Sequence, residues 1–277
     1  MLNLLPDLPV LEVIVDNDLR FHVVLPDHIN VQAIRLRVPG RIANSWAIVD
    51  DSPHSVLRPG VFLFSPCLES GQEEFITTSG VLVQDQAGNR FMTVAAHGIG
   101  PHAKLYQKLP LESRRLIGEA HIKLTCADIS LVRLEDGVDF KNELFTQLEH
   151  NHIQFDKLFG ETPSDIIDIH KPVYLSSPVT GATDGVVIHR SWRPYLTPPV
   201  LSQEPRIQCV VYDWIWTGQN HDSQAMVSDI VCGAPVWDAQ GSVLGFLRYS
   251  IQEGPWSGFS AAVRADHLVE AGYTLAM

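Results

Sequence analysis

The chain has 277 residues, of which 45% are hydrophobic and 19% charged, a composition that fits a folded globular protein and excludes a disordered one. Its formal net charge of −12 disfavours nucleic acid and anionic membranes as partners, and we expect neither to be bound. No apolar run approaches the length that a membrane span needs.

The first residues, the histidines and the cysteines bear on location and metal binding. The first residues carry no basic segment, and Asp7 and Pro9 interrupt their apolar run, so we expect no signal peptide and a cytoplasmic location. His150 and His152 are close together but have no Cys or carboxylate cluster beside them, so we expect no metal site. The cysteines form no CxxC pair and are expected to be reduced thiols: Cys67, Cys126, Cys209 and Cys232.

Residues 1–70 have the pattern of short strands and turns. Residues 10–16 alternate apolar and acidic side chains, and after the Asn17-Asp18 turn residues 21–25 predict the second strand of a hairpin. Further short strands are predicted at 31–38, 46–49 and 61–64. Since these segments carry no recognisable chemistry, we interpret residues 1–70 as a β-rich extension packed on the main domain.

Beyond residue 70 the chain predicts many short strands separated by Gly- and Pro-rich turns. Two short helices, at 111–119 and 142–149, and an irregular loop at 189–203 are also expected. Short strands at regular spacing indicate an all-β barrel or sandwich. The predicted strands are 75–78, 80–83, 91–96, 121–125, 129–134, 172–175, 185–188, 207–216 and two within 235–249.

Three residues at the ends of predicted strands have side chains suited to nucleophilic catalysis. They are His97 at the end of strand 91–96, Asp128 before strand 129–134, and Cys232 on a Cys-Gly-Ala-Pro turn. Taken singly, His97 is more simply a histidine at the rim of the core, Asp128 a turn residue, and Cys232 a small buried hydrophobic residue.

The order of these segments resembles the chymotrypsin-like (trypsin-like) peptidases. Residues 91–97 (Phe-Met-Thr-Val-Ala-Ala-His) resemble Leu-Thr-Ala-Ala-His-Cys, and residues 127–131 (Ala-Asp-Ile-Ser-Leu) resemble the segment around the buried aspartate. Residues 232–236 (Cys-Gly-Ala-Pro-Val) resemble Ser-Gly-Gly-Pro-Val, with cysteine in the place of the nucleophile. Residues 179–186 and 258–263 add weaker similarity, so the resemblance covers roughly residues 70–277.

The resemblance implies two six-stranded Greek-key barrels with the site in the cleft between them. The implied division is an extension (1–70), a first barrel with His97 and Asp128 (71–155) and a second barrel with Cys232 (156–277). Picornavirus-type proteases of this fold also use cysteine as nucleophile. The pattern Gly-Ala-Pro-Val-Trp-Asp with Gly-Phe-Leu-Arg-Tyr is similar to a fungal group of cytosolic trypsin-like proteins.

One departure from the family falls beside the nucleophile. The resemblance places the oxyanion hole at the backbone N–H groups of Ile230 and Cys232, where the family has glycine in place of Ile230. A β-branched residue disfavours the backbone conformation needed there. The hole is therefore formed differently, is collapsed until something binds, or is absent.

The resemblance also places the substrate pocket. No acidic residue lies at its expected base, so a preference for Lys or Arg is not indicated, and Met226 suggests an apolar or neutral pocket. The residues that are expected to contact substrate are Met226, Arg248, Tyr249, Ser250, Gly258 and Ser260.

The resemblance thus implies an endopeptidase that hydrolyses peptide bonds through an acyl-enzyme on Cys232, in which His97 takes the thiol proton and Asp128 orients His97. We expect it to need no cofactor and to have a protein or peptide substrate as its partner. Two alternatives stay open. One is an inactive or partner-activated pseudopeptidase that binds peptides or proteins, and the other is a protein that cleaves only itself.

Overall fold

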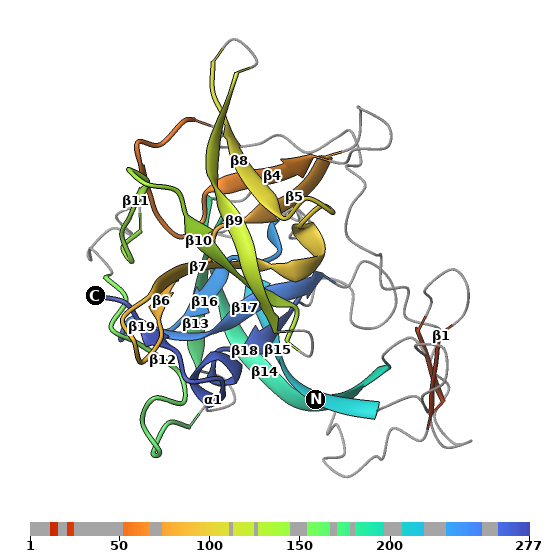
Figure 1. Cartoon of the computed structure of the whole chain (residues 1–277). Helices are drawn as coiled ribbons and strands as arrows, with labels where there is room; N and C mark the ends of the chain where they lie inside the picture. The colour runs from red at the N-terminus through yellow and green to blue at the C-terminus, as the bar shows by residue number, and fades with distance from the viewer. Residues whose placement is uncertain are drawn as a thin grey trace.

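The regular elements that the computed structural model describes are nearly all β-strands (Figure 1). It describes residues 12–15, 21–24, 52–66, 74–110, 113–124, 127–144, 154–166, 171–177, 181–196, 207–218, 231–250 and 260–277. Its one described α-helix, α1 (Asp266–Glu270), is a single short turn near the C-terminus. The all-β class predicted from short apolar segments and frequent turns is confirmed.

The first sheet has eight strands and carries the histidine and the aspartate. The end of β5 returns to β7, since Gly80 N donates to Thr93 O (2.7 Å) and Ala95 N donates to Thr77 Oγ1 (3.2 Å). In spatial order its strands are β19 (Thr274–Leu275), β6 (Leu82–Gln84), β7 (Arg90–Ala95), β10 (Ile129–Leu134), β9 (Arg114–Leu124), β8 (Lys104–Lys108), β4 (Phe62–Pro66) and β5 (Glu74–Thr78).

The second sheet closes on itself, because β17 pairs with both β16 and β18. Its strands in spatial order are β12 (Lys157–Leu158), β17 (Ser242–Ser250), β16 (Pro235–Trp237), β13 (Pro172–Ser177), β14 (Gly181–Leu196), β15 (Ile207–Gly218) and β18 (Ser260–Arg264). The ring runs through β13, β14, β15, β18, β17 and β16, and β12 adds to β17 from outside. The Cys232 turn leads directly into this ring.

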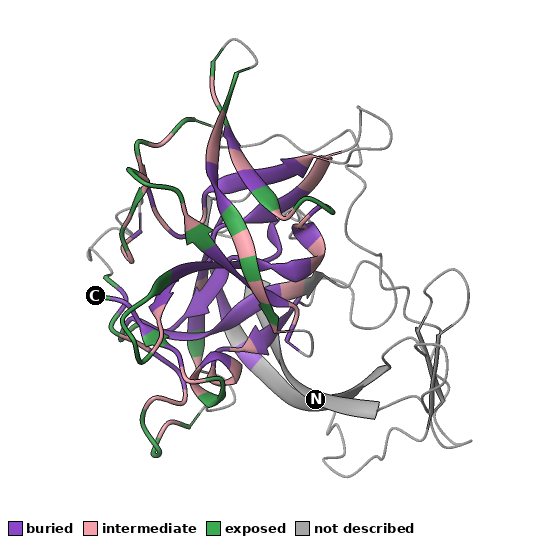
Figure 2. Ribbon diagram, viewed as in Figure 1, coloured by how far each residue is buried: buried purple, intermediate pink, exposed green. Residues whose placement is uncertain are grey.

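A continuous apolar core joins the two sheets (Figure 2). Phe91 and Leu131 of the first sheet belong to the same buried cluster as Trp237 and Phe246 of the second. The neighbouring residue Met92 points to the other side of its strand, into a second cluster inside the first sheet. Burial on both faces explains why these strands are continuous apolar runs in the sequence, and it holds their ends, where the site lies, in fixed positions.

The N-terminal hairpin is confirmed as β1 (Glu12–Val15) and β2 (Phe21–Val24), which pair antiparallel. The strands expected at 31–38 and 46–49 lie outside the described residues. Strand β4, expected as part of the extension, pairs with β5 and β8, so the first sheet already begins before residue 70. A short parallel pair, β3 (Val56–Leu57) with β11 (Asp139–Phe140), also ties this region to the first barrel segment.

Both predicted helices are wrong where the structure describes them. Residues 114–119 belong to β9, which is paired on both edges and buries Ile117 completely, so sheet pairing overrides the local helical pattern. Residues 142–144 are irregular, and the side chain of Asn142 bonds the backbone of Leu82 and Ala276. Asn142 therefore satisfies neighbouring strands and does not begin a helix.

The predicted loop at 189–203 is also wrong over its first part. Strand β14 continues to Leu196 and pairs with β15 along its length, apart from a register shift between Val187 and His189. Pro194 does not stop the strand, although proline removes a backbone donor. The sequence also gave no signal for β8 or for β19, which returns the C-terminus to β6 of the first sheet.

Candidate active site

His97 lies at the end of β7, on the short 3-10 turn η1 (Ala96–Gly98). The following Gly98 passes so close to β5 that a Cβ there would lie 2.7 Å from Ile76 O and from Thr77 Cβ. Glycine is thus required for the turn to pack against β5. The imidazole is largely buried, with its side chain 15% exposed.

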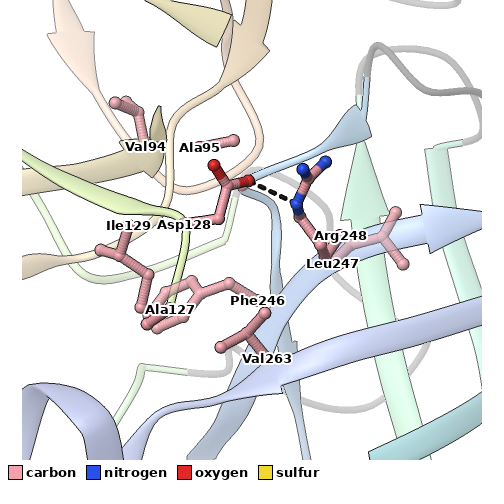
Figure 3. Close-up of a pocket in the computed structure, with 10 residues that line it drawn as sticks. Val94, Ala95, Ala127, Asp128, Ile129, Phe246, Leu247, Arg248 and Val263 are labelled. Atoms are coloured by element: carbon pink, nitrogen blue, oxygen red, sulfur yellow. Dashed lines mark ion pairs between the residues drawn. The ribbon is translucent and has the colours of Figure 1, made fainter. Parts of the chain in front are cut away.

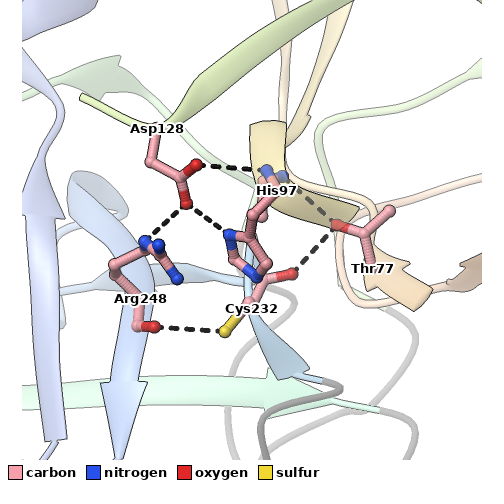
Figure 4. A network of polar contacts seen from close by, with 6 residues as sticks. Thr77, His97, Asp128, Cys232 and Arg248 are labelled. Carbon is pink, nitrogen blue, oxygen red and sulfur yellow. Dashed lines mark hydrogen bonds and ion pairs between the residues drawn. The ribbon is translucent and has the colours of Figure 1, made fainter. Parts of the chain in front are cut away.

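Asp128 reaches His97 from the turn before β10. Its backbone has a φ of 52°, in the left-handed region that aspartate tolerates better than most residues. The pairing of Ile129 with Ala95 sets the two turns side by side, and Ala96 N donates to Asp128 O (2.8 Å). The carboxylate accepts from His97 twice, from the backbone N at Oδ1 (3.1 Å) and from Nδ1 at Oδ2 (2.5 Å) (Figure 4).

Cys232 lies on a tight turn that is fastened to the first sheet. Its carbonyl oxygen accepts from Thr78 N (3.0 Å) and from Thr77 Oγ1 (3.1 Å). The next residue, Gly233, has a φ of 95°, and a Cβ there would lie 2.7 Å from Thr78 O and 2.8 Å from Ala95 N. The Cys232 turn therefore depends on glycine for both its conformation and its contact with the strands that deliver His97.

The thiol of Cys232 is directed at a backbone carbonyl. The residue is 1% exposed, and Sγ donates to Arg248 O at 3.2 Å (Figure 4). Within the described part of the chain, no group forms a hydrogen bond with His97 Nε2, which is buried. The ring nitrogen that would receive the thiol proton is therefore vacant in this structure.

The guanidinium of Arg248 contacts the same carboxylate oxygen as His97. Arg248 Nε lies 2.5 Å from Asp128 Oδ2, and both side chains are mostly buried (Figure 3). Below this ion pair is a small cavity between the sheets with mainly apolar walls, in which charges interact more strongly than they do in water. Its lining is Val94, Ala95, Ala127, Asp128, Ile129, Gly233, Phe246, Leu247, Arg248 and Val263.

These surroundings set the protonation states of the pair. Burial lowers the pKa of His97, the hydrogen bond to Asp128 opposes that change, and the charges of Arg248 and Lys123 lower the pKa further. Burial works against ionisation of Asp128, but the hydrogen bond from His97 and the charge of Arg248 outweigh it, so the pKa of Asp128 is lowered. At neutral pH the pair is a carboxylate and a neutral imidazole whose Nδ1–H points at Asp128.

His97, Asp128 and Cys232, which are widely separated in the sequence, meet around Arg248. Of the other expected site residues, Ile230, Met226 and Gly258 lie outside the described residues. Tyr249 and Ser250 are described as backbone of β17 only, and Ser260 is buried at the start of β18. Arg248 was expected in the wall of the substrate pocket, and its side chain instead points to Asp128.

Two contacts of the site were not predicted from the sequence. Thr77 bridges the two halves of the site, since its hydroxyl donates to Cys232 O and accepts from Ala95 N. Arg248 was named, but its contact with Asp128 was not foreseen. An arginine within an otherwise apolar strand is the one sequence signal that a buried acidic partner was needed.

Metal-assisted chemistry has no support in the part of the chain that the structure describes. There, no group of three or more His, Cys, Asp or Glu side chains is placed to hold a metal ion. No described helix is long and apolar enough to cross a membrane.

Comparison with solved structures identifies the fold. A glutamic-acid-specific serine protease that uses a histidine triad in substrate binding superposes with a TM-score of 0.53 at 15% identity, over 79% of this chain and 100% of its own. Nocardiopsis protease (TM-score 0.52, 11% identity) and an α-lytic protease homologue (0.52, 14%) each match 80% of this chain and at least 99% of their own. This chain has the chymotrypsin-like fold.

Sequence comparison adds no closer relative. No protein-family model matches the chain, and no curated protein matches it. The expected fungal cytosolic group and the cysteine nucleophile gain no support from the similar structures, which are serine proteases. Since these similarities are at 15% identity or less, they establish the fold, and the chemistry must be argued from the residues of this chain.

Proposed function

We propose that this protein is a cysteine-type endopeptidase in which Cys232 is the nucleophile, His97 the general base and acid, and Asp128 the group that orients His97. The observation that carries the proposal is the short contact of His97 Nδ1 with Asp128 Oδ2 beside the Cys232 turn. The fold adds to it, because the similar structures are proteases.

The proposed reaction begins with the thiol of Cys232. Asp128 accepts the hydrogen bond from Nδ1–H, so the lone pair of His97 is on Nε2, where it takes the thiol proton. The sulfur attacks the carbonyl carbon of the peptide bond and gives a tetrahedral oxyanion. The C–N bond then breaks, the amine leaves with the proton from Nε2, and a thioester to Cys232 remains.

The second half of the reaction restores the enzyme. Water gives a proton to His97 Nε2 and adds to the thioester carbon, and the C–S bond breaks. The thiolate recovers its proton from His97 as the carboxylic acid product leaves. Every proton that His97 takes is returned, so the cycle consumes one water molecule and one peptide bond and requires no cofactor.

The thiol must turn before it attacks, because it points at Arg248 O in this structure. The backbone of Cys232 is held through its carbonyl by Thr77 and Thr78, so this change is a rotation of the side chain and not of the turn. Such a rotation moves only the sulfur atom and leaves the hydrogen bonds of the Cys232 carbonyl in place. The observed thiol position is therefore compatible with an active enzyme.

A second function is an inactive or partner-activated pseudopeptidase that binds peptides or proteins. The thiol contact with Arg248 O and the Ile230 substitution favour it. In that case the fold presents a peptide-binding surface, and catalysis is absent or awaits a protein that builds the oxyanion hole. Self-processing is a third outcome. The proposed location is the cytoplasm, where the thiol stays reduced.

The test is hydrolysis of a mixed peptide library by the full chain, followed by mass spectrometry. We expect new peptide termini with the wild type, none with Cys232→Ala, and none with the wild type after alkylation. Hydrolysis that persists in Cys232→Ala contradicts the assignment. A stable wild type that binds peptides and cleaves none supports the binding function, and a shortened chain reports self-processing.

A further inference from the structure

Arg248 lies at an irregularity of the ladder between β17 and β18. Leu247 pairs with Ala262 and Tyr249 pairs with Ala261, so Arg248 is the extra residue of a β-bulge. A bulge turns a side chain away from the direction that strand alternation would give it. Here the bulged residue is Arg248, which contacts both Cys232 and Asp128 of the candidate triad.

The two contacts of Arg248 reach the two ends of the site. Its carbonyl oxygen accepts from the thiol of Cys232, and its guanidinium lies on Asp128 Oδ2. His97 Nδ1 uses that same oxygen (Figure 4). The negative charge of Asp128 therefore interacts with the Arg248 guanidinium as well as with His97.

We propose that Arg248 is a positioning residue that fixes the Asp128 carboxylate and holds His97 as a neutral imidazole, which restrains proton transfer from Cys232. The role assigned to His97 rests on the proposed function, whereas the electrostatic effect of Arg248 on His97 does not.

The physical reason is the charge that forms when His97 accepts a proton. An imidazolium beside a lone carboxylate is stabilised, but a guanidinium on the same carboxylate repels it in surroundings of low polarity. Among the described residues, the charged and titratable groups that face His97 are Asp128, Arg248, the Cys232 thiol and, at longer range, Lys123 on β9. Arg248 is the cation that touches the carboxylate itself.

The experiment is an NMR titration of the His97 ring in chains that carry Cys232→Ala, which removes coupling to the thiol. His97→Gln identifies the His97 signal among the twelve histidines. We expect Arg248→Gln to raise the protonated fraction of the ring roughly three- to tenfold at a pH where it is mostly neutral in the parent. Arg248→Lys, which keeps a charge but loses the guanidinium, should give an intermediate value.

The matched control is Lys123→Gln, which removes an exposed and more distant cation and should change the titration much less than Arg248→Gln. Identical His97 titrations in Arg248→Gln, Arg248→Lys and the parent would overturn the proposal. If Arg248→Gln does not fold, the comparison of Arg248→Lys with the parent decides. None of these outcomes depends on peptide hydrolysis. The endopeptidase proposal can therefore fail while the proposal for Arg248 holds, and the proposal for Arg248 can fail while the endopeptidase proposal holds.

Discussion

The two halves of the candidate site differ in how far the structure has assembled them. On the first sheet, His97 and Asp128 are joined by two hydrogen bonds, one from the backbone and one from the ring. On the second, the Cys232 turn is fastened through its backbone, but its thiol donates to Arg248 O, and no group among the described residues forms a hydrogen bond with His97 Nε2. The His97–Asp128 pair is therefore preorganised, whereas the Cys232 thiol is directed at a backbone carbonyl.

The difference has a structural origin. The His97–Asp128 half is built from two adjacent strands of one sheet, β7 and β10, whose pairing fixes both turns. The Cys232 half meets it where the sheets touch, at Thr77, Thr78 and the bulge at Arg248 among other contacts. Perturbing each half separately should show which one limits the chemistry.

The largest expected effect comes from the preorganised half. Asp128→Asn leaves the size of the side chain but can donate to His97 Nδ1, which favours the wrong tautomer. It should lower kcat/KM for peptide hydrolysis by about 10³–10⁴-fold. Asp136→Asn, which changes an exposed carboxylate in a turn after β10, is the matched control and should keep wild-type rates. Equal rates in the two variants would remove Asp128 from the mechanism.

The contact between the halves should be sensitive to Gly233. In Gly233→Ala the new Cβ lies 2.7 Å from Thr78 O on a backbone with a φ of 95°, so we expect a loss of about 2–4 kcal/mol in the free energy of unfolding. Gly88→Ala is the control, since Gly88 has a φ of 83° with no atom within 4 Å of the added Cβ, and should lose about 1–2 kcal/mol. Denaturant unfolding measures both, and equal losses would show that the turn does not pack against β5.

A smaller effect should follow from the hydroxyl that bridges the halves. Thr77→Val keeps the shape of the buried side chain but removes the bonds to Cys232 O and Ala95 N. We expect a loss of about 1–2 kcal/mol in stability. Thr274→Val, at an exposed position of β19, should be neutral. Thermal unfolding of the two variants makes the comparison, and a neutral Thr77→Val would mean that the bridge contributes nothing.

The smallest effect is the pH dependence of stability. Because the pKa of His97 is lowered on folding, the folded chain binds fewer protons than the unfolded chain between that lowered value and about 6.5. Stability should thus fall as pH decreases through this window, by at most about 1.4 kcal/mol per pH unit from this group. The slope should flatten in His97→Gln, and an unchanged slope would contradict the lowered pKa. The lowered pKa of Asp128 affects the free energy of unfolding only at more acidic pH, below the usual pKa of an aspartate.

The sequence predicted the preorganised half better than the other. His97 and Asp128 each end or begin an apolar strand, and the apolar pattern placed β7 and β10, while the resemblance to chymotrypsin-like peptidases singled out the two residues. The order of the three motifs in that resemblance also predicted the fold, and their strands are recognisable because they are buried on both sides and keep an apolar signature. Residues 114–119, by contrast, were wrongly predicted as a helix, because their pairing with β8 and β10 outweighs the local helical pattern.

The Arg248 contact was out of reach of sequence reasoning. Arg248 and Asp128 are distant in the chain, and a bulge that depends on the register of β17 against β18 directs the side chain. No local pattern encodes such a register shift. Thr77 likewise looks like any strand threonine until the Cys232 turn is packed against it. Both contacts form where the two sheets pack against each other.

The most direct measurement of the central claim is the rate at which iodoacetamide alkylates Cys232 at neutral pH, in the wild type and in His97→Gln. If His97 takes the thiol proton, its loss should slow alkylation of Cys232 by about tenfold or more, with the modified residue identified by mass spectrometry. His121→Gln, on the exposed face of β9, should leave the rate unchanged. Equal alkylation rates in the wild type and His97→Gln would show that the two residues do not act together and would contradict the proposed nucleophile.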